Sequence, residues 1–352
     1  MKKTKIVCTL GPASRDEKVL EKMLLNGMNV ARLNFSHGSH EYHKETIELF
    51  RKVRDKLQIP AAIMLDTKGP EIRLGDFENE EVTLIKGDLF TLTTKNILGN
   101  QEIVSITYKD LPSQLQIGNK ILIDDGKVSL EVLDSTITDL KCKVLVGGKI
   151  SNHKGVNVPN VHLNFEYLSQ KDKEDLKFGV ENDVDYVAAS FVRSKEDVKS
   201  LRNYLDYIGG KNIKIISKIE NIEGVDNFDE ILNSSDGIMV ARGDMGVEVE
   251  YERLPGLQKK FIRKCYQAGK VVITATQMLE SMIHSLTPTR AEITDVANAV
   301  FDGTSAIMLS GETAMGNHPD KVVKTMAKIA RQAENDALNL RVYDLSLIHI
   351  SE

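Results

Sequence analysis

The sequence has 352 residues, of which 41% are hydrophobic and 28% charged, a composition typical of a globular protein with a sizeable core. Its net charge of −5 comes from interspersed acidic and basic residues, it contains no Trp, and only 5% of its residues are aromatic. These values disfavour nucleic acid or an anionic membrane as a partner. Three widely spaced cysteines and the lack of a long apolar run favour a cytoplasmic protein without disulfides.

Strand and helix patterns alternate along most of the chain. Outside residues 70–167 they predict strands at residues 5–10, 29–35, 61–65, 186–191, 215–219, 237–241, 271–275 and 305–309. Helices are expected between and after these strands, at residues 16–25, 40–57, 171–180, 195–207, 257–268, 290–300 and 321–333. Residues 1–69 and 168–341 together approach the ~250 residues of a (β/α)8 TIM barrel. Because no dinucleotide-binding glycine motif is present, we favour this closed α/β fold over an open, doubly wound sheet.

Residues 70–167 interrupt the alternation with short period-two runs, which predict a small all-β insertion forming a barrel of its own. Its strands are expected at residues 82–85, 90–93, 120–123, 128–132 and 142–146, with a hairpin turn at Asp125-Gly126. The insertion follows the third strand, at the end where such barrels carry active sites, so we predict that it acts as a lid. Gly148-Lys149 lacks the flanking residues of a phosphate-binding loop, and we interpret it as a turn.

Two neighbouring predicted strands end in charged residues that suit a metal site. Lys218 and Glu220 are two residues apart and therefore share a strand face, and Asp244 closely follows the next apolar run. Two carboxylates beside a lysine suit a divalent cation with a phosphoryl group or an enolate next to it. The alternative is a simple surface salt bridge between Lys218 and Glu220. It is less favoured, because charge at the end of a buried strand is costly unless it is used or paired.

Polar residues also end the other predicted strands. Together they indicate a catalytic site at the mouth of the barrel, the end where the strands have their carboxyl termini. Each alone has an ordinary explanation, such as a helix cap or a local hydrogen bond. Gly243 and Asp244 open a turn whose backbone amides could bind a substrate carboxylate. His37 is the nearest imidazole, and an outward-facing histidine is an equally good interpretation. The remaining members of the set are Arg32, Asn34, Ser36, Asp66, Thr67, Thr276, Ser310 and Glu312.

Seven segments, in order and spread along residues 1–342, resemble the pyruvate kinase family. They are residues 32–38 (RLNFSHG), 65–73 (LDTKGPEIR), 154–157 (KGVN), 215–220 (IISKIE), 241–244 (ARGD), 275–281 (ATQMLES) and 309–314 (LSGETA). The resemblance implies a barrel with a β-barrel lid. It also implies phosphoryl transfer from phosphoenolpyruvate to ADP, giving pyruvate and ATP in the last step of glycolysis, with Mg²⁺ (or Mn²⁺) and K⁺ as cofactors.

The resemblance also implies roles for residues around the phosphoenolpyruvate. Lys218 would stabilise the transferring phosphoryl group and the enolate, and Arg32 would contact the phosphate. Glu220 and Asp244 would hold Mg²⁺. The substrate carboxylate would be bound by the backbone of Gly243 and Asp244 and by the Thr276 hydroxyl. The residues implied as candidates for protonating the enolate are Thr276, Ser310 and Glu312, the last through water.

The potassium and nucleotide sites follow from the same motifs. The resemblance places K⁺ at Asn34, Ser36, Asp66 and Thr67, and Glu71 stands where potassium-dependent members carry a glutamate. The implied nucleotide contacts are Asn34, Phe35, Ser36, His37, Arg73 and Lys154.

Members of this family continue into a C-terminal α/β domain that carries a subunit interface of the homotetramer and often an effector site. We expect this domain to be absent here and interpret residues 344–352 as a tail foreign to the family. The hypothesis is therefore a complete active site without the tetramer and its regulation. Two alternatives remain: another metal-enolate barrel enzyme, such as a lyase or aldolase without ADP dependence, and a fragment that binds phosphoenolpyruvate or metal without turnover.

Overall fold

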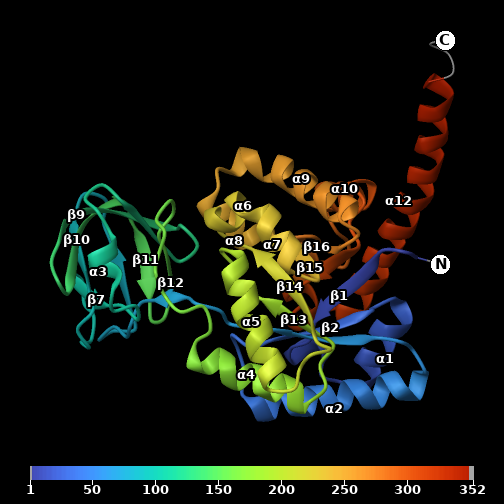
Figure 1. Cartoon of the computed structure of the whole chain (residues 1–352), viewed down its shortest axis with the longest axis horizontal. Coiled ribbons are helices and arrows are strands. Elements are labelled where there is room, and N and C mark those ends of the chain that lie inside the picture. The colour runs from blue at the N-terminus through green and yellow to red at the C-terminus, as the bar shows by residue number, and fades with distance from the viewer. Residues whose placement is uncertain (1, 349–352) are drawn as a thin grey trace.

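Eight parallel strands close into a barrel in the order β1-β17-β16-β15-β14-β13-β3-β2, which confirms the predicted fold class (Figure 1). The computed structural model describes residues 2–348, and the side chains of residues 2–337. The barrel strands are β1 (Lys5–Thr9), β2 (Val30–Asn34), β3 (Ala62–Asp66), β13 (Tyr186–Ala189), β14 (Lys214–Ile219), β15 (Gly237–Ala241), β16 (Val271–Ala275) and β17 (Ala306–Leu309).

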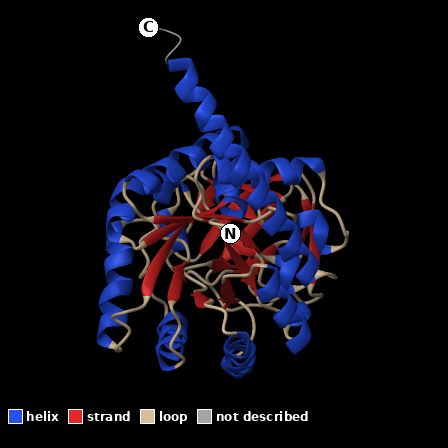
Figure 2. Ribbon diagram, turned by 90° about the vertical axis from the view of Figure 1, so that its right-hand side faces the viewer, coloured by secondary structure: helices blue, strands red, loops and turns tan. Residues whose placement is uncertain are grey.

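Helices surround the strands on the outside of the barrel (Figure 2). Several begin at a side-chain cap: Asp16 and Ser39 accept hydrogen bonds from backbone amides in the first turns of α1 and α2. The helices are α1 (Glu17–Asn26), α2 (His40–Leu57), α4 (Gln170–Glu181), α5 (Lys195–Tyr207), α6 (Ile222–Asp226), α7 (Phe228–Ser234), α8 (Arg242–Glu248), α9 (Leu254–Gln267), α10 (Arg290–Phe301), α11 (Gly311–Ala314) and α12 (Pro319–Ile348). Short 3₁₀ turns lie at Pro12–Ser14, Tyr251–Arg253 and Glu280–Ile283.

Strand parity divides the barrel residues between two apolar cores. Leu33 and Phe35 point outward into the larger core between strands and helices, as their spacing predicts. Alternate residues such as Met64 and Met239 fill the inside of the barrel in a separate cluster. With the interior packed, the polar residues at the strand ends face the mouth, where function is expected.

The chain leaves the barrel after β3 and forms a seven-stranded sheet in the order β4-β12-β8-β9-β10-β6-β7, with β5 and β11 paired beside it. A bridge between Leu74 and Ile106 joins its two ends, and the sheet encloses its own apolar core. We call this region the lid. Its elements are β4 (Ile72–Arg73), β5 (Glu81–Leu84), β6 (Leu89–Thr93), β7 (Ile103–Ser105), α3 (Leu111–Gln114), β8 (Lys120–Ile123), β9 (Val128–Ser135), β10 (Asp139–Val146), β11 (Gly148–Ser151) and β12 (Gly155–Asn157).

Of two turns expected from the sequence, one is wrong and one is confirmed. Gly148-Lys149 is not a turn, because both residues belong to β11 and pair with Leu84 and Thr83 of β5. Asp125-Gly126 is the hairpin turn between β8 and β9, as predicted, with both residues at positive φ.

The last helix, α12, includes part of the C-terminal segment. Of the segment 344–352, interpreted from the sequence as a tail foreign to the family, residues 344–348 belong to α12 and the rest lies outside the described residues. Among the described residues, no helix combines the length and apolar character needed to span a membrane.

Candidate active site

The mouth of the barrel gathers charged residues from several neighbouring strands. Lys218 lies on β14 and Glu220 follows its last residue, while Asp66 ends β3 and Arg32 lies on β2. Each of these four residues is at most 8% exposed. Because parallel strands place their carboxyl ends at one rim, residues far apart in the chain meet there.

The four charged groups form one continuous network. The Lys218 ammonium lies 3.1 Å from Asp66 Oδ1 and 3.0 Å from Glu220 Oε1, and donates to Ser190 Oγ at 2.7 Å. Arg32 Nε donates to Asp66 Oδ2 at 2.6 Å, and its Nη1 donates to Thr9 Oγ1 at 2.8 Å. Lys218 and Glu220 thus do pair, as the structural alternative supposed, but the pair is buried at the mouth and not on the surface.

Burial and neighbouring charge shift the pKa values of these groups. Burial alone would lower the pKa of Lys218, but Asp66 and Glu220 raise it above its ordinary value, so the ammonium stays charged. Burial would raise the pKa of Asp66, yet Arg32 and Lys218 hold it below its usual range. Burial, aided by Asp244, raises the pKa of Glu220 to about 8 against the opposing effect of Lys218. A further cation beside Glu220 is therefore needed to keep its carboxyl ionised at neutral pH.

Glu220 and Asp244 fit a divalent cation that is completed by other ligands. Asp244 lies in the first turn of α8, which follows β15, the strand paired with β14. Within the described part of the chain, no three His, Cys, Asp or Glu side chains cluster closely enough to hold a metal alone. Mg²⁺ commonly takes one or two carboxylates and fills its remaining positions with water and substrate phosphate. The donor set therefore fits Mg²⁺ bound together with a substrate.

The four residues predicted to bind K⁺ come from adjacent strands, and all carry oxygen donors, which suit a hard cation. Asn34 and Asp66 are register partners on β2 and β3. Several of these oxygens already accept hydrogen bonds: Asn34 Oδ1 from the Ser36 amide at 3.1 Å and Thr67 Oγ1 from the Ser190 amide at 3.1 Å. Both Asp66 oxygens also face the Arg32 and Lys218 cations, so its carboxylate is shared by several groups.

Thr276 follows β16 in an unusual backbone conformation. Its φ of 71° and that of 53° at Gln277 lie in the left-handed region, which residues other than glycine seldom adopt. The Thr276 hydroxyl donates to Ala275 O at 2.6 Å and accepts from the Gly243 amide at 2.8 Å. The Gly243 amide predicted to bind the substrate carboxylate is therefore already engaged by Thr276, and a carboxylate there would have to replace that contact.

Ser310 and Glu312 follow β17, and their side chains differ in their surroundings. Glu312 is fully buried, and its two oxygens accept from the Leu279 and Ser310 amides at 3.1 and 2.7 Å. Burial raises the pKa of its carboxyl despite these contacts. Among the described residues, the Ser310 hydroxyl is one of the few buried polar groups without a hydrogen-bond partner. Glu312 thus ties the β17 turn to the β16 loop, and Ser310 keeps a free hydroxyl.

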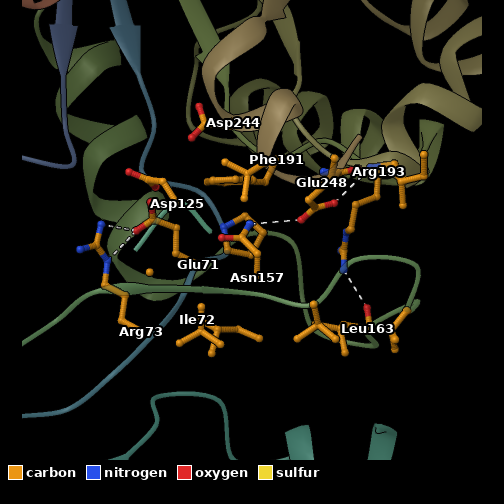
Figure 3. A pocket seen from close by; sticks show the side chains of 18 of the residues that line it. Glu71, Ile72, Arg73, Asp125, Asn157, Leu163, Phe191, Arg193, Asp244 and Glu248 are labelled. Carbon is orange, nitrogen blue, oxygen red and sulfur yellow. Dashed lines mark hydrogen bonds and ion pairs between the residues drawn. The ribbon is translucent and has the colours of Figure 1, made fainter. Parts of the chain in front are cut away.

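A cavity of about 280 Å³ lies between lid and barrel (Figure 3), and two of the six predicted nucleotide contacts, Arg73 and Lys154, line it, whereas residues 34–37 do not. Arg73 and Lys154 reach it from the lid, paired with Glu71 at 2.6 Å and with Asp124 at 2.8 Å. On the barrel side the cavity extends to Asp244. The structure therefore brings two lid cations and one predicted metal ligand to the same space.

Phe35 and His37 both belong to the segment predicted to contact the nucleotide, but Phe35 is buried and His37 is exposed. The Phe35 side chain is buried against the His43 ring, with ring centroids 4.1 Å apart, so it leaves only its backbone for a ligand. His37 is exposed, and its carbonyl oxygen accepts a hydrogen bond from His43 Nε2 at 2.8 Å.

Sequence reasoning missed two residues of the network and one contact between lid and barrel. Ser190 bonds both Lys218 and Asp66 Oδ1, and the Phe191 amide donates to Glu220 Oε2 at 2.6 Å. Asn157 of β12 donates to Glu248 of α8 at 3.2 Å (Figure 3). Parity along β13 places Ser190 on the mouth side, which was the available signal, but a lone serine at a strand end is too common to single out.

Comparison with known proteins agrees with this geometry. The family model "Pyruvate kinase, barrel domain" matches residues 1–323. A pyruvate kinase of Clostridium perfringens is 53% identical over 335 residues, which are 95% of this chain and 71% of that protein. Those of Staphylococcus haemolyticus and Clostridium acetobutylicum are each 54% identical, over 95% and 96% of this chain. The matched region is 57% of the Staphylococcus protein and 71% of the Clostridium acetobutylicum protein.

Proposed function

The chain belongs to the pyruvate kinase family of phosphotransferases, and we propose that it transfers the phosphoryl group of phosphoenolpyruvate to ADP. Mg²⁺ (or Mn²⁺) and K⁺ would be its cofactors. The observation that carries the proposal is the buried Lys218 ammonium, held by Asp66 and Ser190 beside the two carboxylates Glu220 and Asp244. The small number of cysteines, all buried and free, supports a cytoplasmic location for such a glycolytic enzyme.

In the proposed reaction the bond between phosphorus and the enol oxygen breaks while a bond forms to the terminal phosphate oxygen of ADP. The enolate left behind takes a proton at its methylene carbon and becomes pyruvate. Lys218 and Arg32 would neutralise the phosphoryl oxygens and the enolate oxygen, and the Lys218 ammonium remains charged in its buried position. Mg²⁺ bound at Glu220 and Asp244 would supply additional positive charge next to these oxygens.

The proton donor to the enolate is proposed to be Thr276 or Ser310. Thr276 lies next to Gly243, which adjoins Asp244, so its hydroxyl is on the metal side of the mouth. Ser310 offers a hydroxyl without a partner among the described residues, and the neighbouring Glu312 would act through water. Neither hydroxyl has an acidic pKa of its own, so a relay from solvent would replace the proton that is used.

ADP is proposed to enter the cavity between lid and barrel. Arg73 and Lys154 line it, and their cations suit diphosphate oxygens. Binding would exchange their present partners, Glu71 and Asp124, for phosphate. The oxygens of Asn34, Ser36, Asp66 and Thr67 are proposed to hold K⁺ beside Arg32, where a monovalent cation adds positive charge near the phosphoryl group.

Substitution of Lys218 by Met tests the proposal, because it removes the charge and keeps a side chain of similar length. We expect pyruvate formation to be lost while calorimetry with Mg²⁺ still detects phosphoenolpyruvate binding. Wild-type levels of pyruvate formation in Lys218→Met would contradict the assigned role. Binding by the wild-type chain without turnover would instead identify a protein that only binds its ligand.

A further inference from the structure

We propose that Arg242 is a positioning residue that fixes the Thr276 hydroxyl at the mouth of the barrel. The inference rests on the proposed function, because it assigns to Arg242 the support of a group that would contact the substrate. Arg242 begins α8, directly before Gly243 and Asp244, and its side chain is 10% exposed. A guanidinium this deeply buried needs partners for its N–H groups.

Backbone carbonyls of the Thr276 turn are the central partners of Arg242. Its Nε donates to Ala275 O at 3.2 Å and its Nη2 to Thr276 O at 2.5 Å. The Nη2 atom also lies 2.9 Å from the sulfur of Met278. The planar fork therefore spans consecutive peptide groups of one turn, which a lysine ammonium cannot do from a single point.

The turn needs such support because its backbone is strained. Thr276 and Gln277 both adopt positive φ, a conformation that costs non-glycine residues free energy and persists only when the surroundings impose it. The two carbonyls bound by Arg242 belong to the residues that lead into and begin this turn. We infer that the guanidinium holds the turn in this conformation.

The same contacts determine where the Thr276 hydroxyl lies. Ala275 O accepts from both Arg242 Nε and Thr276 Oγ1, and Thr276 Oγ1 in turn accepts from the Gly243 amide. Arg242 and Gly243 are adjacent in the chain, so one short segment contacts Thr276 twice. The Arg242 side chain binds its backbone, and the Gly243 amide binds its hydroxyl. Without the guanidinium, Ala275 O would lose one of its two donors and the turn could relax away from the mouth.

Arg242 is itself held from the opposite side. Its Nη1 lies 2.8 Å from the Asp295 carboxylate of α10 and 3.3 Å from Gln258 Oε1 of α9. Charge-assisted contacts of this kind fix the plane of a guanidinium. The complete path runs from α10 through Asp295 and Arg242 to the β16 turn that carries Thr276.

The first experiment is a double-mutant cycle of Arg242→Ala and Thr276→Ala, read as kcat and kcat/KM for phosphoenolpyruvate. We expect each single variant to lose on the order of 10²-fold in kcat, the loss that a misplaced group causes. The double variant should be little worse than either single one, because Thr276→Ala removes the hydroxyl that Arg242→Ala displaces. Arg242→Lys should stay impaired, since it keeps the charge but not the fork.

The second experiment is chemical rescue with guanidinium chloride at tens of millimolar. Guanidinium should restore part of the kcat of Arg242→Ala but none in the double variant, because the restored group acts through Thr276. Arg202→Ala is the matched control: Arg202 also binds a backbone carbonyl, Ile213 O at 2.7 Å, and the Asp236 carboxylate, but outside the mouth. It should keep its activity and show no gain with guanidinium.

The outcomes separate the inference from the proposed function. Full activity of Arg242→Ala, or losses that add in the double variant, would overturn the inference and leave a defective Thr276→Ala as support for the proposed role of Thr276. Full activity of Thr276→Ala would overturn both the inference and the proposed role of Thr276. If Arg242→Ala does not fold, judged by circular dichroism, Asp295→Asn takes its place in the cycle, and losses that add with Thr276→Ala would again overturn the inference.

Discussion

Asp66 is the residue on which the charged network of the mouth depends. One of its carboxylate oxygens accepts a hydrogen bond from Arg32, and the other contacts Lys218 and Ser190. The residue is 1% exposed. A buried ion pair adds little stability over an apolar pair, but removing one partner leaves the other charge buried and uncompensated. Two cations lose a partner at once when Asp66 is neutralised.

Asp66→Asn is therefore expected to lower the free energy of unfolding by about 3–5 kcal/mol. Lys218→Met is the comparison variant, because it leaves the Asp66–Arg32 pair intact. Glu220 loses its lysine partner in this variant, but its raised pKa allows it to take up a proton, so the change should cost less. Urea unfolding followed by circular dichroism measures both. Equal stability of the wild type and Asp66→Asn would show that the network is not a stabilising unit.

Acid should act through the same carboxylate. The pKa of Asp66 lies below its ordinary value of 3.8, so its contribution is complete above that pH and is lost as the pH falls through the folded-state pKa. The unfolding free energy of Asp66→Asn should consequently depend less on pH below about 4 than that of the wild type. Parallel pH profiles of the two proteins would contradict this assignment.

Glu220 leads to a prediction about metal binding. Because burial raises its pKa to about 8 in the metal-free protein, the carboxyl is partly protonated at pH 7. Mg²⁺ requires the carboxylate, so binding should release that proton, and affinity should rise with pH until about 8. Calorimetric titrations at pH 7 in two buffers of different ionisation enthalpy would detect the release. Heats that do not depend on the buffer, or an unchanged affinity between pH 6 and 8, would count against it.

Among the individual site residues, the sequence predicts the charged ones better than the residues that hydrogen-bond to them. Lys218, Glu220 and Asp244 stand out because charged residues lie at or just past the end of an apolar strand, and the structure places all three at the mouth. Ser190 and Arg242 do not stand out, since a serine or arginine has many ordinary uses and their partners are distant in the chain. The contact of Arg242 with Ala275 is set by the closure of the barrel, which no local pattern specifies.

Among the elements, α8 connects the mouth with the lid. It carries Asp244 in its first turn and Glu248 at its end, and Glu248 accepts from Asn157 of β12 and from the Ile222 amide, each at 3.2 Å. Ile222 begins α6, just after Glu220. One carboxylate thus links the lid to the segments that follow both predicted metal ligands.

Asn157→Ala should weaken the attachment of the lid without unfolding the barrel. Losing one hydrogen bond of this type costs about 1 kcal/mol, so the amides of β12 and of residues 158–168 should exchange with solvent roughly fivefold faster. Hydrogen exchange with mass spectrometry resolves this, and peptides from α2 serve as the internal control. Unchanged exchange in the lid connection would mean that other contacts hold it.

Element prediction succeeded for the barrel and was incomplete for the lid. The eight barrel strands are buried apolar runs, all but β3 are followed by a helix before the next strand, and their pattern is local. The short strands β4, β7, β11 and β12 were missed, and Gly148-Lys149 was misinterpreted as a turn. These strands have two to four residues and are defined by pairing with distant segments, so their sequences carry little periodicity.

The whole molecule consists of a barrel and a lid with separate apolar cores. Phe90 belongs to the lid core and Phe228 to the core between barrel and helices, where it stacks on Phe261 at 4.0 Å. Because the two cores share no residue, loss of packing in one need not weaken the other. The cavity at the mouth lies between these two bodies.

Phe90→Ala and Phe228→Ala test this independence as a matched pair. Each removes a fully buried ring and should cost about 3–5 kcal/mol within its own core. We expect Phe90→Ala to speed hydrogen exchange in the lid strands only, and Phe228→Ala to speed it in the barrel. Faster exchange throughout the chain in both variants would indicate a single cooperative unit.

The most direct test of phosphoryl transfer to ADP is the stoichiometry of pyruvate and ATP formed from phosphoenolpyruvate and ADP. We expect the two products to appear in equal amounts, omission of Mg²⁺ to abolish both, and omission of K⁺ to reduce both strongly. Pyruvate released without ATP when ADP is left out would contradict this transfer, because the lid cations and the cavity would then serve no phosphoryl acceptor.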